Sequence, residues 1–125
     1  MRLLLDTHVL LWWLADDPAL SSTAQAAILA PDHEIFVGAT TVWEIGIKVA
    51  LGKLTVPGDL EEAIEAEGFR PMAFTVRHAA IAGSLPRHHG DPFDRALIAQ
   101  AQLEGCTLVT RDEQIRRYGI PILPA

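Results

Sequence analysis

Short apolar runs alternate with segments of helical periodicity along this chain, and that order restricts the possible folds more than any other feature. The first run, Leu3-Leu4-Leu5, has the continuous apolar character of a strand that is buried on both faces of a sheet. Similar runs place the other strands at residues 34–38, 69–74, 106–110 and 120–123. Strands that alternate with helices form a parallel sheet covered by helices, so the sequence predicts an α/β fold.

The segments between the strands carry local helix signals. Asp91 and Pro92 suit an N-cap and a first helical position, and Thr41-Val42-Trp43-Glu44 matches a capping box. Asp59 is placed to cap a helix that Gly68 ends. Helices are expected over residues 9–14, from Ser21 or Ser22 to residue 28, and over residues 41–52, 60–67, 76–85, 92–103 and 113–117.

The length of 125 residues suits one domain that spans residues 1–125, and half of the residues are hydrophobic. Ten basic side chains against sixteen acidic ones give a net charge of −6, which argues against a passive nucleic-acid binder with a basic surface. An enzyme that holds cations is compatible with this charge, because a bound metal ion reverses the local potential. The single cysteine, Cys106, excludes an intrachain disulfide and indicates an intracellular protein.

The N-terminus has some apolar character, but it lacks the features of a signal peptide. Asp6 and His8 interrupt the apolar residues, and no small-residue cleavage site follows. The longest apolar run, residues 9–15, is far shorter than the roughly 18 residues that a membrane span needs. We therefore expect a cytoplasmic protein with no membrane partner.

Four acidic residues lie close to the expected junctions between strands and helices. Asp6 follows the first strand, and Asp112 follows the fourth. Glu44 begins the helix after the second strand, and Asp94 begins the helix before the fourth. The carboxyl ends of the strands in an open parallel sheet share one edge, so these acids are expected to converge there.

Two compatible interpretations of these acids stay open. Each acid can stabilise a helix N-terminus, where acidic side chains are favoured as caps or first-turn charges. Packed together, however, four carboxylates would repel one another and resist ionisation unless cations were present. Mg²⁺, or Mn²⁺ as an alternative, accepts carboxylate and water oxygens, and such an ion can activate water for phosphodiester hydrolysis. The pattern leaves open whether one or two ions are held.

Several sequence blocks follow one another in a specific order over nearly the whole chain. They are residues 4–14 (LLDTHVLLWWL), residues 42–45 (VWEI) with Lys48 and residues 52–54 (GKL), residues 89–95 (HGDPFDR), residues 97–101 (LIAQA) and residues 108–112 (LVTRD). This combination resembles the PIN-domain family. Within that family, it is similar to the VapC-type toxins of bacterial type II toxin–antitoxin modules.

The resemblance implies a three-layer α/β/α PIN-like fold around a central, mainly parallel sheet. It also implies a Mg²⁺- or Mn²⁺-dependent endoribonuclease that cleaves RNA with metal-activated water, forms a homodimer and is neutralised by a cognate antitoxin protein. The acidic residues of the family correspond to Asp6, Glu44, Asp94 and Asp112. The hydroxyl found near the last acid corresponds to Thr110. Asp91 is an additional acid that is either a helix cap or an outer-sphere partner of the metal.

Basic residues adjoin the acids in the sequence. Arg95 follows Asp94, and Arg111 precedes Asp112. Each arginine is expected either to contact a phosphate of bound RNA or to screen the neighbouring acid. Lys48 lies four residues after an acid and is expected to form an ordinary i,i+4 ion pair.

The histidines and tryptophans have structural explanations. His88 and His89 are expected in a solvated loop, with metal ligation or proton transfer as the alternative. Trp12 and Trp13 are assigned to the core or an interface, because base-stacking aromatics normally lie among basic residues. Trp43 is assigned to the core.

Two other functions are weighed against a ribonuclease. One is a module that binds an antitoxin but cleaves weakly or not at all, and the complete set of acids argues against it. The other is a different Mg²⁺-dependent phosphate-ester hydrolase. A haloacid-dehalogenase-like phosphatase needs a second aspartate where this chain has His8, and a receiver domain needs paired acids after the first strand.

Overall fold

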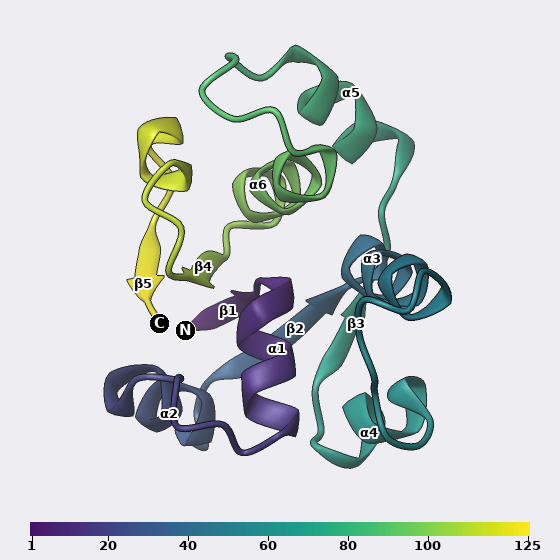
Figure 1. Cartoon of the computed structure of the whole chain (residues 1–125). Helices are drawn as coiled ribbons and strands as arrows, with labels where there is room; N and C mark the ends of the chain where they lie inside the picture. Colours follow the sequence, from purple (N-terminus) through teal and green to yellow (C-terminus); the bar gives the residue numbers. More distant parts are fainter.

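All five expected strands form, and together they build a parallel sheet with the order β3-β2-β1-β4-β5 (Figure 1). The computed structural model describes residues 1–125. The strands are β1 (Arg2–Leu5), β2 (Glu34–Gly38), β3 (Arg70–Met72), β4 (Thr107–Thr110) and β5 (Ile122–Pro124). Leu4 of β1 is paired with Phe36 on one side and Leu108 on the other, so β1 lies at the centre of the sheet. The α/β fold predicted from the sequence is confirmed.

Helices cover both faces of the sheet and give the three α/β/α layers. They are α1 (Thr7–Leu14), α2 (Ser22–Leu29), α3 (Ala39–Ala50), α4 (Leu60–Ala66), α5 (Val76–Ser84) and α6 (Pro92–Glu104). A single 3₁₀ turn, η1 (Ile115–Tyr118), takes the place of the helix expected over residues 113–117. In Figure 1, α5 and α6 lie above the sheet, whereas α1, α2 and α4 lie below it.

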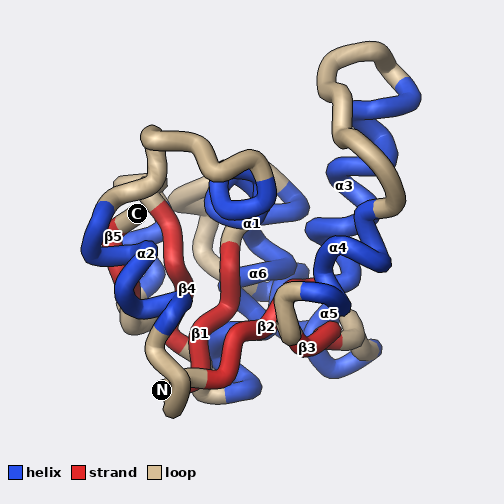
Figure 2. Tube along the Cα trace, turned by 90° about the horizontal axis from the view of Figure 1, so that it is seen from below, coloured by secondary structure: helices blue, strands red, loops and turns tan.

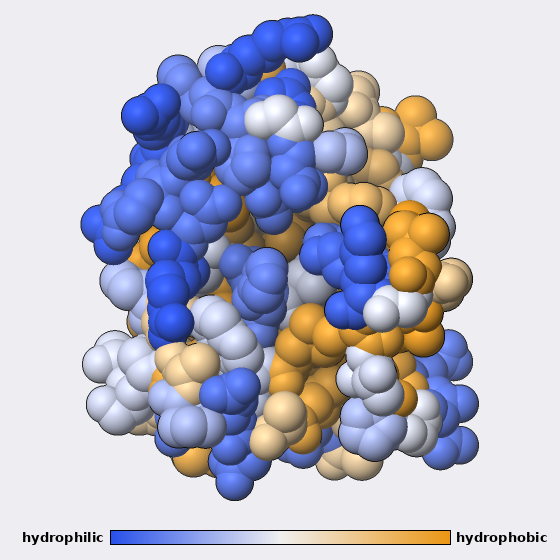
Figure 3. Space-filling view, in the orientation of Figure 1, coloured by the Kyte–Doolittle hydropathy of each residue, from blue (hydrophilic) through white to orange (hydrophobic).

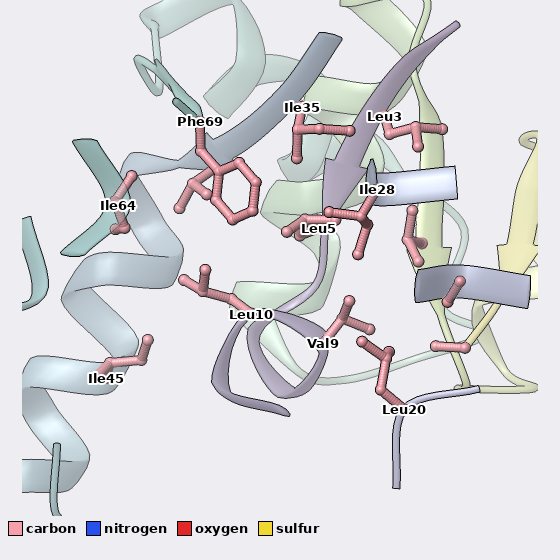
Figure 4. Close-up of a cluster of buried hydrophobic side chains, with 14 residues drawn as sticks. Leu3, Leu5, Val9, Leu10, Leu20, Ile28, Ile35, Ile45, Ile64 and Phe69 are labelled. Atoms are coloured by element: carbon pink, nitrogen blue, oxygen red, sulfur yellow. The ribbon is translucent and has the colours of Figure 1, made fainter. Parts of the chain in front are cut away.

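The core consists of two apolar clusters, because successive side chains of a buried strand point to opposite faces. Leu3 and Leu5 belong to the cluster between the sheet and helices α1 and α2. Leu4 belongs to the cluster between the sheet and α6. Figure 4 shows the first cluster, in which Val9 and Leu10 of α1 lie close to the side chains from the sheet. The central strand is therefore buried on both faces, as its continuous apolar sequence predicts.

Most helix boundaries follow the local signals in the sequence. The Ser21 hydroxyl accepts a hydrogen bond from the backbone N–H of Ala24, and Asp59 caps α4 in the same way. Asp91 is the N-cap of α6, and Gly105 ends that helix in the left-handed conformation that suits glycine. These caps satisfy backbone groups that would otherwise lack partners at the helix ends.

The capping box expected at Thr41 to Glu44 is wrong. Helix α3 begins at Ala39, its N-cap is Gly38, and no side chain caps it. Thr41 instead lies inside the helix and is buried. Strand β2 ends at Gly38 and α3 begins at the next residue, so Thr41 already lies in the first turn of the helix and cannot be its N-cap. A Cβ atom at Gly38 would lie 2.7 Å from Oε1 of the buried Gln100.

Helix α3 and the loop that follows it project beyond the rest of the fold (Figure 2). Trp43 on this helix is 64% exposed, so its assignment to the core is wrong. Val49 and Leu51 are also exposed. No helix combines the length and the apolar character that crossing a membrane requires.

Candidate functional site

Asp6 follows β1 and is held by two hydrogen bonds to its carboxylate. Oδ1 accepts the backbone N–H of Val9 at 3.1 Å, which makes Asp6 the N-cap of α1. Oδ2 accepts the hydroxyl of Thr110 at 2.5 Å. The side chain is buried, and this burial raises the pKa of Asp6 above its usual value despite both hydrogen bonds. The predicted cap is confirmed, and it fixes the carboxylate at the end of the central strand.

Thr110 connects Asp6 to the acid that follows β4. Its hydroxyl accepts the backbone N–H of Asp112 at 3.1 Å while it donates to Asp6. Oδ1 of Asp112 accepts the backbone N–H of Gln114 at 2.9 Å. This bond forms a side-chain turn ahead of η1, whose N-cap is Gln114. Asp112 is therefore oriented by its own loop and does not cap the 3₁₀ turn.

Glu44 lies in the second turn of α3 and is buried. The hydroxyl of Thr7 donates to its Oε1 at 2.6 Å, and Nζ of Lys48 donates to its Oε2 at 2.9 Å. The bond to Glu44 raises the pKa of Lys48. The expected i,i+4 pair is confirmed, and each carboxylate oxygen of Glu44 accepts one hydrogen bond.

Asp94 lies in the first turn of α6, three residues after the cap. Oδ1 of Asp91 accepts the backbone N–H groups of Phe93 and Asp94 at 2.8 and 3.1 Å, which confirms the predicted cap. Burial raises the pKa of Asp94 to about 7, and the negative charge of Asp91 adds to the effect. Asp94 thus lies where a carboxylate charge is poorly stabilised by the protein alone.

His89 lies beside these acids, contrary to the expectation of a solvated loop. Its Nε2 is 2.8 Å from Oδ2 of Asp94 and 3.0 Å from Oδ2 of Asp112, and its side chain is only 15% exposed. The backbone N–H of Asp91, the N-cap of α6, donates to Nδ1 of this ring at 3.2 Å. His88, by contrast, is exposed, and its ring contacts that of Tyr118 edge to face.

The acids from distant parts of the chain line one hollow, which we call the acid pocket. Its walls consist of Asp6, Thr7, His8, Trp12, Glu44, Lys48, Asp91, Asp94, Arg111 and Asp112. The predicted convergence at the carboxyl edge of the sheet is therefore present in the geometry. His89, Asp94 and Asp112 also place one possible ligand atom each within 4.8 Å of one another.

The two arginines near the acids are both engaged with the backbone. Arg111 donates to the carbonyl oxygens of Ala19 and Ala125, and its guanidinium lies 4.4 Å from the ring centroid of Trp12. Arg95 donates to four carbonyl oxygens, those of Ala82, Leu85, Pro86 and His89. Arg111 lines the acid pocket, whereas Arg95 lines a neighbouring cleft. These bonds favour a structural role for Arg95 over contact with RNA phosphate.

That neighbouring cleft is more apolar than the acid pocket. Trp43 and Phe93 line it and contact each other edge to face, with ring centroids 5.5 Å apart. Each of these aromatic residues directly precedes an acid of the pocket. On the face shown in Figure 3, hydrophobic residues gather on the side of α3, at the right, while hydrophilic residues cover the upper left.

Thr7 was not predicted from the sequence as a contact of the site, and His89 was considered there only as the alternative to a solvated loop. The signal for Thr7 is its position directly after Asp6, where a hydroxyl on the first helical turn can reach α3. The signal for His89 is its position two residues before the Asp91 cap. Tyr118 is a third such residue, since its hydroxyl accepts the backbone N–H of His89 at 2.9 Å.

The donor set of the acid pocket fits a hard divalent cation. Its acidic walls offer carboxylate oxygens, which Mg²⁺ and Mn²⁺ accept as ligands. Hydrogen bonds from Thr7 and Lys48 orient Glu44, and one from Thr110 orients Asp6. The raised pKa of Asp94 indicates that positive charge would be favoured beside it.

Comparisons with known proteins agree with this geometry. The sequence model of the PIN domain family matches residues 3–121. Ribonuclease VapC22 of Mycobacterium tuberculosis is 35% identical, and the match covers 94% of this chain and 92% of that protein.

Solved structures of toxin–antitoxin proteins share the fold. A structure of VapBC2 from Rickettsia felis, bound to a promoter DNA fragment, superposes with a TM-score of 0.70 at 16% identity, over 99% of this chain and 98% of that chain. FitAcB from Neisseria gonorrhoeae gives a TM-score of 0.68 at 21% identity, over 97% of this chain and 96% of that chain.

Proposed function

Because the chain belongs to the PIN-domain family, we propose that it is a metal-dependent endoribonuclease of the VapC toxin type. The substrate is RNA, the cofactor is Mg²⁺ or Mn²⁺, and the partner is a cognate antitoxin. Residues 1–125 act as a single PIN domain in this proposal. A toxin that cleaves cellular RNA would act in the cytoplasm.

One observation carries the proposal. Carboxylates from four separate segments of the chain line the acid pocket. Two of them, Asp6 and Asp112, lie near opposite ends of the sequence. Several have hydrogen-bond donors that fix their direction. A group of acids that merely capped helices would not need to share one hollow.

The residues of the pocket have distinct proposed roles. When bound, the metal ion would supply the Lewis acidity that activates water and stabilises charge on the scissile phosphate. The residues that would hold it are Asp6, Glu44, Asp94 and Asp112. Thr110 keeps the carboxylate of Asp6 in place, and no nucleophilic side chain is required.

Asp91 and the arginines have supporting roles in this scheme. Asp91 uses Oδ1 as a helix cap, so Oδ2 is the oxygen that would act as an outer-sphere partner. Arg111 brings the one guanidinium among the walls of the acid pocket and is the candidate for contact with an RNA phosphate. Arg95 is proposed to hold the loop before α6 through its backbone contacts.

The solved relatives support a protein partner. They include VapBC2 and FitAB, each bound to a DNA fragment. On this chain, Trp43, Val49 and Leu51 on or directly after the projecting α3 are exposed apolar side chains, which commonly mark protein interaction sites. We propose that the chain pairs with a cognate antitoxin and forms a homodimer.

The proposal is tested by cleavage of single-stranded RNA with purified, antitoxin-free protein in Mn²⁺ or in EDTA. Asp6→Asn is the test variant, and Asp59→Asn is its matched control. Both aspartates are N-caps that accept one backbone N–H at 3.1 Å, and asparagine caps helices equally well. We expect Mn²⁺-dependent cleavage that Asp6→Asn abolishes and Asp59→Asn retains.

Two outcomes would contradict the proposal. Equal cleavage by the wild type and Asp6→Asn would indicate a contaminating nuclease. Absence of cleavage by a wild-type protein that binds its antitoxin would favour a binding module with little or no activity.

A further inference from the structure

His89 lies between two carboxylates that come from different elements. Asp94 belongs to α6, and Asp112 follows β4. Nε2 of His89 donates a hydrogen bond of 3.0 Å to Oδ2 of Asp112 and lies 2.8 Å from Oδ2 of Asp94. One imidazole nitrogen thus links two groups whose negative charges would otherwise drive them apart.

The other ring nitrogen determines what Nε2 can do. Nδ1 of His89 accepts the backbone N–H of Asp91 at 3.2 Å. A neutral imidazole that accepts at Nδ1 carries its proton at Nε2, so Nε2 is a donor. Metal-binding histidines usually have the reverse arrangement, with the second nitrogen donating to a carbonyl or carboxylate. His89 is therefore arranged to hold carboxylates and not to coordinate a cation.

The backbone around His89 is fixed at three points. Its N–H donates to the hydroxyl of Tyr118 at 2.9 Å, and its carbonyl accepts a bond of 3.4 Å from Arg95. The Tyr118 hydroxyl in turn donates to the carbonyl of Pro86 at 2.9 Å. These bonds tie the loop to η1 and α6, so the imidazole is held in place.

The contact with His89 also leaves an oxygen of Asp94 free. His89 approaches Oδ2, and Oδ1 of Asp94 makes no hydrogen bond within the protein. A carboxylate that is held through one oxygen can present the other to an ion. Hydrogen bonds such as the one between His89 and Asp112 orient metal ligands in many proteins, and their loss commonly weakens metal binding by about 10- to 100-fold.

We propose that His89 is a positioning residue that holds Asp94 and Asp112 in the arrangement that binds the divalent cation. It acts from outside the ligand set and stays in place when the ion binds. This inference rests on the proposed function, because it assumes that the acid pocket takes up Mg²⁺ or Mn²⁺.

Calorimetric titration with Mn²⁺ tests the proposal without measuring cleavage. The variants are His89→Ala, His89→Asn and His89→Gln, with His88→Ala as the matched control. The amide nitrogen of glutamine can replace Nε2 as a donor, whereas asparagine reaches only the position of Nδ1. We expect the alanine and asparagine variants to bind Mn²⁺ about 10- to 100-fold more weakly, and glutamine to restore most of the affinity. His88→Ala is expected to bind as the wild type does.

A second variant acts at a distance from the acids. Tyr118→Phe removes the hydroxyl that anchors the backbone of His89, and we expect a smaller loss of Mn²⁺ affinity. Thermal unfolding in EDTA shows whether each variant is folded before it is titrated. If His89→Ala does not fold, the comparison of His89→Asn, His89→Gln and Tyr118→Phe decides the question.

The outcomes separate this inference from the proposed function. No Mn²⁺ uptake by the wild type overturns the proposed function, and the role of His89 with it. Uptake by the wild type with unchanged affinity in the His89 variants overturns the role of His89 alone. Tighter binding by His89→Ala would also overturn it, since that result means that the imidazole competes with the ion.

Discussion

The hydroxyl of Thr110 donates a 2.5 Å hydrogen bond to Oδ2 of Asp6, although 104 positions separate the two residues in the chain. The bond joins the carboxyl ends of the neighbouring strands β1 and β4. The same hydroxyl accepts the backbone N–H of Asp112. One threonine therefore positions two of the acids that we assign to the metal ion.

Thr110→Val keeps the shape of the side chain but removes both bonds. We expect the free energy of unfolding to fall by about 1–3 kcal/mol, because the buried Asp6 carboxylate and the N–H of Asp112 lose a partner. RNA cleavage per folded molecule should fall, and Thr110→Ser should restore both properties. Urea unfolding and a cleavage assay measure them. A valine variant with wild-type cleavage would show that the hydroxyl is not needed.

Gly38→Ala tests the close packing at the N-cap of α3. The new Cβ would lie 2.7 Å from Oε1 of Gln100, whose amide nitrogen donates to the carbonyl oxygens of Met72 and Ala73. We expect a loss of about 1–3 kcal/mol in the free energy of unfolding.

The double variant Gly38→Ala/Gln100→Ala separates this clash from a general effect at Gly38. Removal of the glutamine side chain also removes the clash, so the two effects should be less than additive. If the losses in the free energy of unfolding, measured by chemical unfolding, are strictly additive, the new Cβ at position 38 does not clash with Gln100.

Arg95→Met tests whether this arginine is structural. The guanidinium donates to four backbone carbonyls. We therefore expect its removal to lower the free energy of unfolding by about 1.5–3 kcal/mol. Arg87→Met, at an exposed position in the loop before α6, is the control and should change stability little. The salt dependence of RNA binding should be the same for Arg95→Met and the wild type. A shallower salt dependence would instead indicate a phosphate contact.

Without metal, the stability of the protein is expected to fall as the pH rises, and Mn²⁺ is expected to offset this fall. Burial and the charge of Asp91 raise the pKa of Asp94 from 3.8 to about 7 in the metal-free protein. Because the folded state disfavours the charged form, the contribution of Asp94 to stability is present at low pH and is lost as the pH rises through about 7.

Thermal unfolding in EDTA between pH 5 and pH 8 measures this effect. Asp94→Asn should flatten the decline with pH, and Mn²⁺ should stabilise the wild type most at the upper end of the range. A decline of the same slope in Asp94→Asn would mean that another group causes it.

The sequence predicted the sheet well because burial on two faces leaves a strong signal. The boundaries of β2 agree with the expected residues 34–38, and α6 begins after Asp91 and ends at Gly105 as its local signals indicate. The start of α3 was predicted wrongly, because β2 runs directly into the helix at Gly38 and leaves Thr41 inside the first turn. A local capping motif does not show where the preceding strand ends.

The site was predictable in its acids but not in its supporting contacts. The position of the four acids relative to strands and helices was enough to bring them to one edge. The role of His89 depends on a turn, on Tyr118 and on the direction of its ring, which no spacing rule gives. Trp43 was assigned to the core, yet it is 64% exposed on the projecting helix α3, where its ring contacts that of Phe93.

The most direct test of the central claim is anomalous diffraction from crystals of the antitoxin-free protein soaked in Mn²⁺. The account predicts an anomalous peak in the acid pocket, within coordination distance of oxygens from Asp6 and Asp94. A pocket that stays without a peak while Mn²⁺ binds elsewhere on the protein would contradict it.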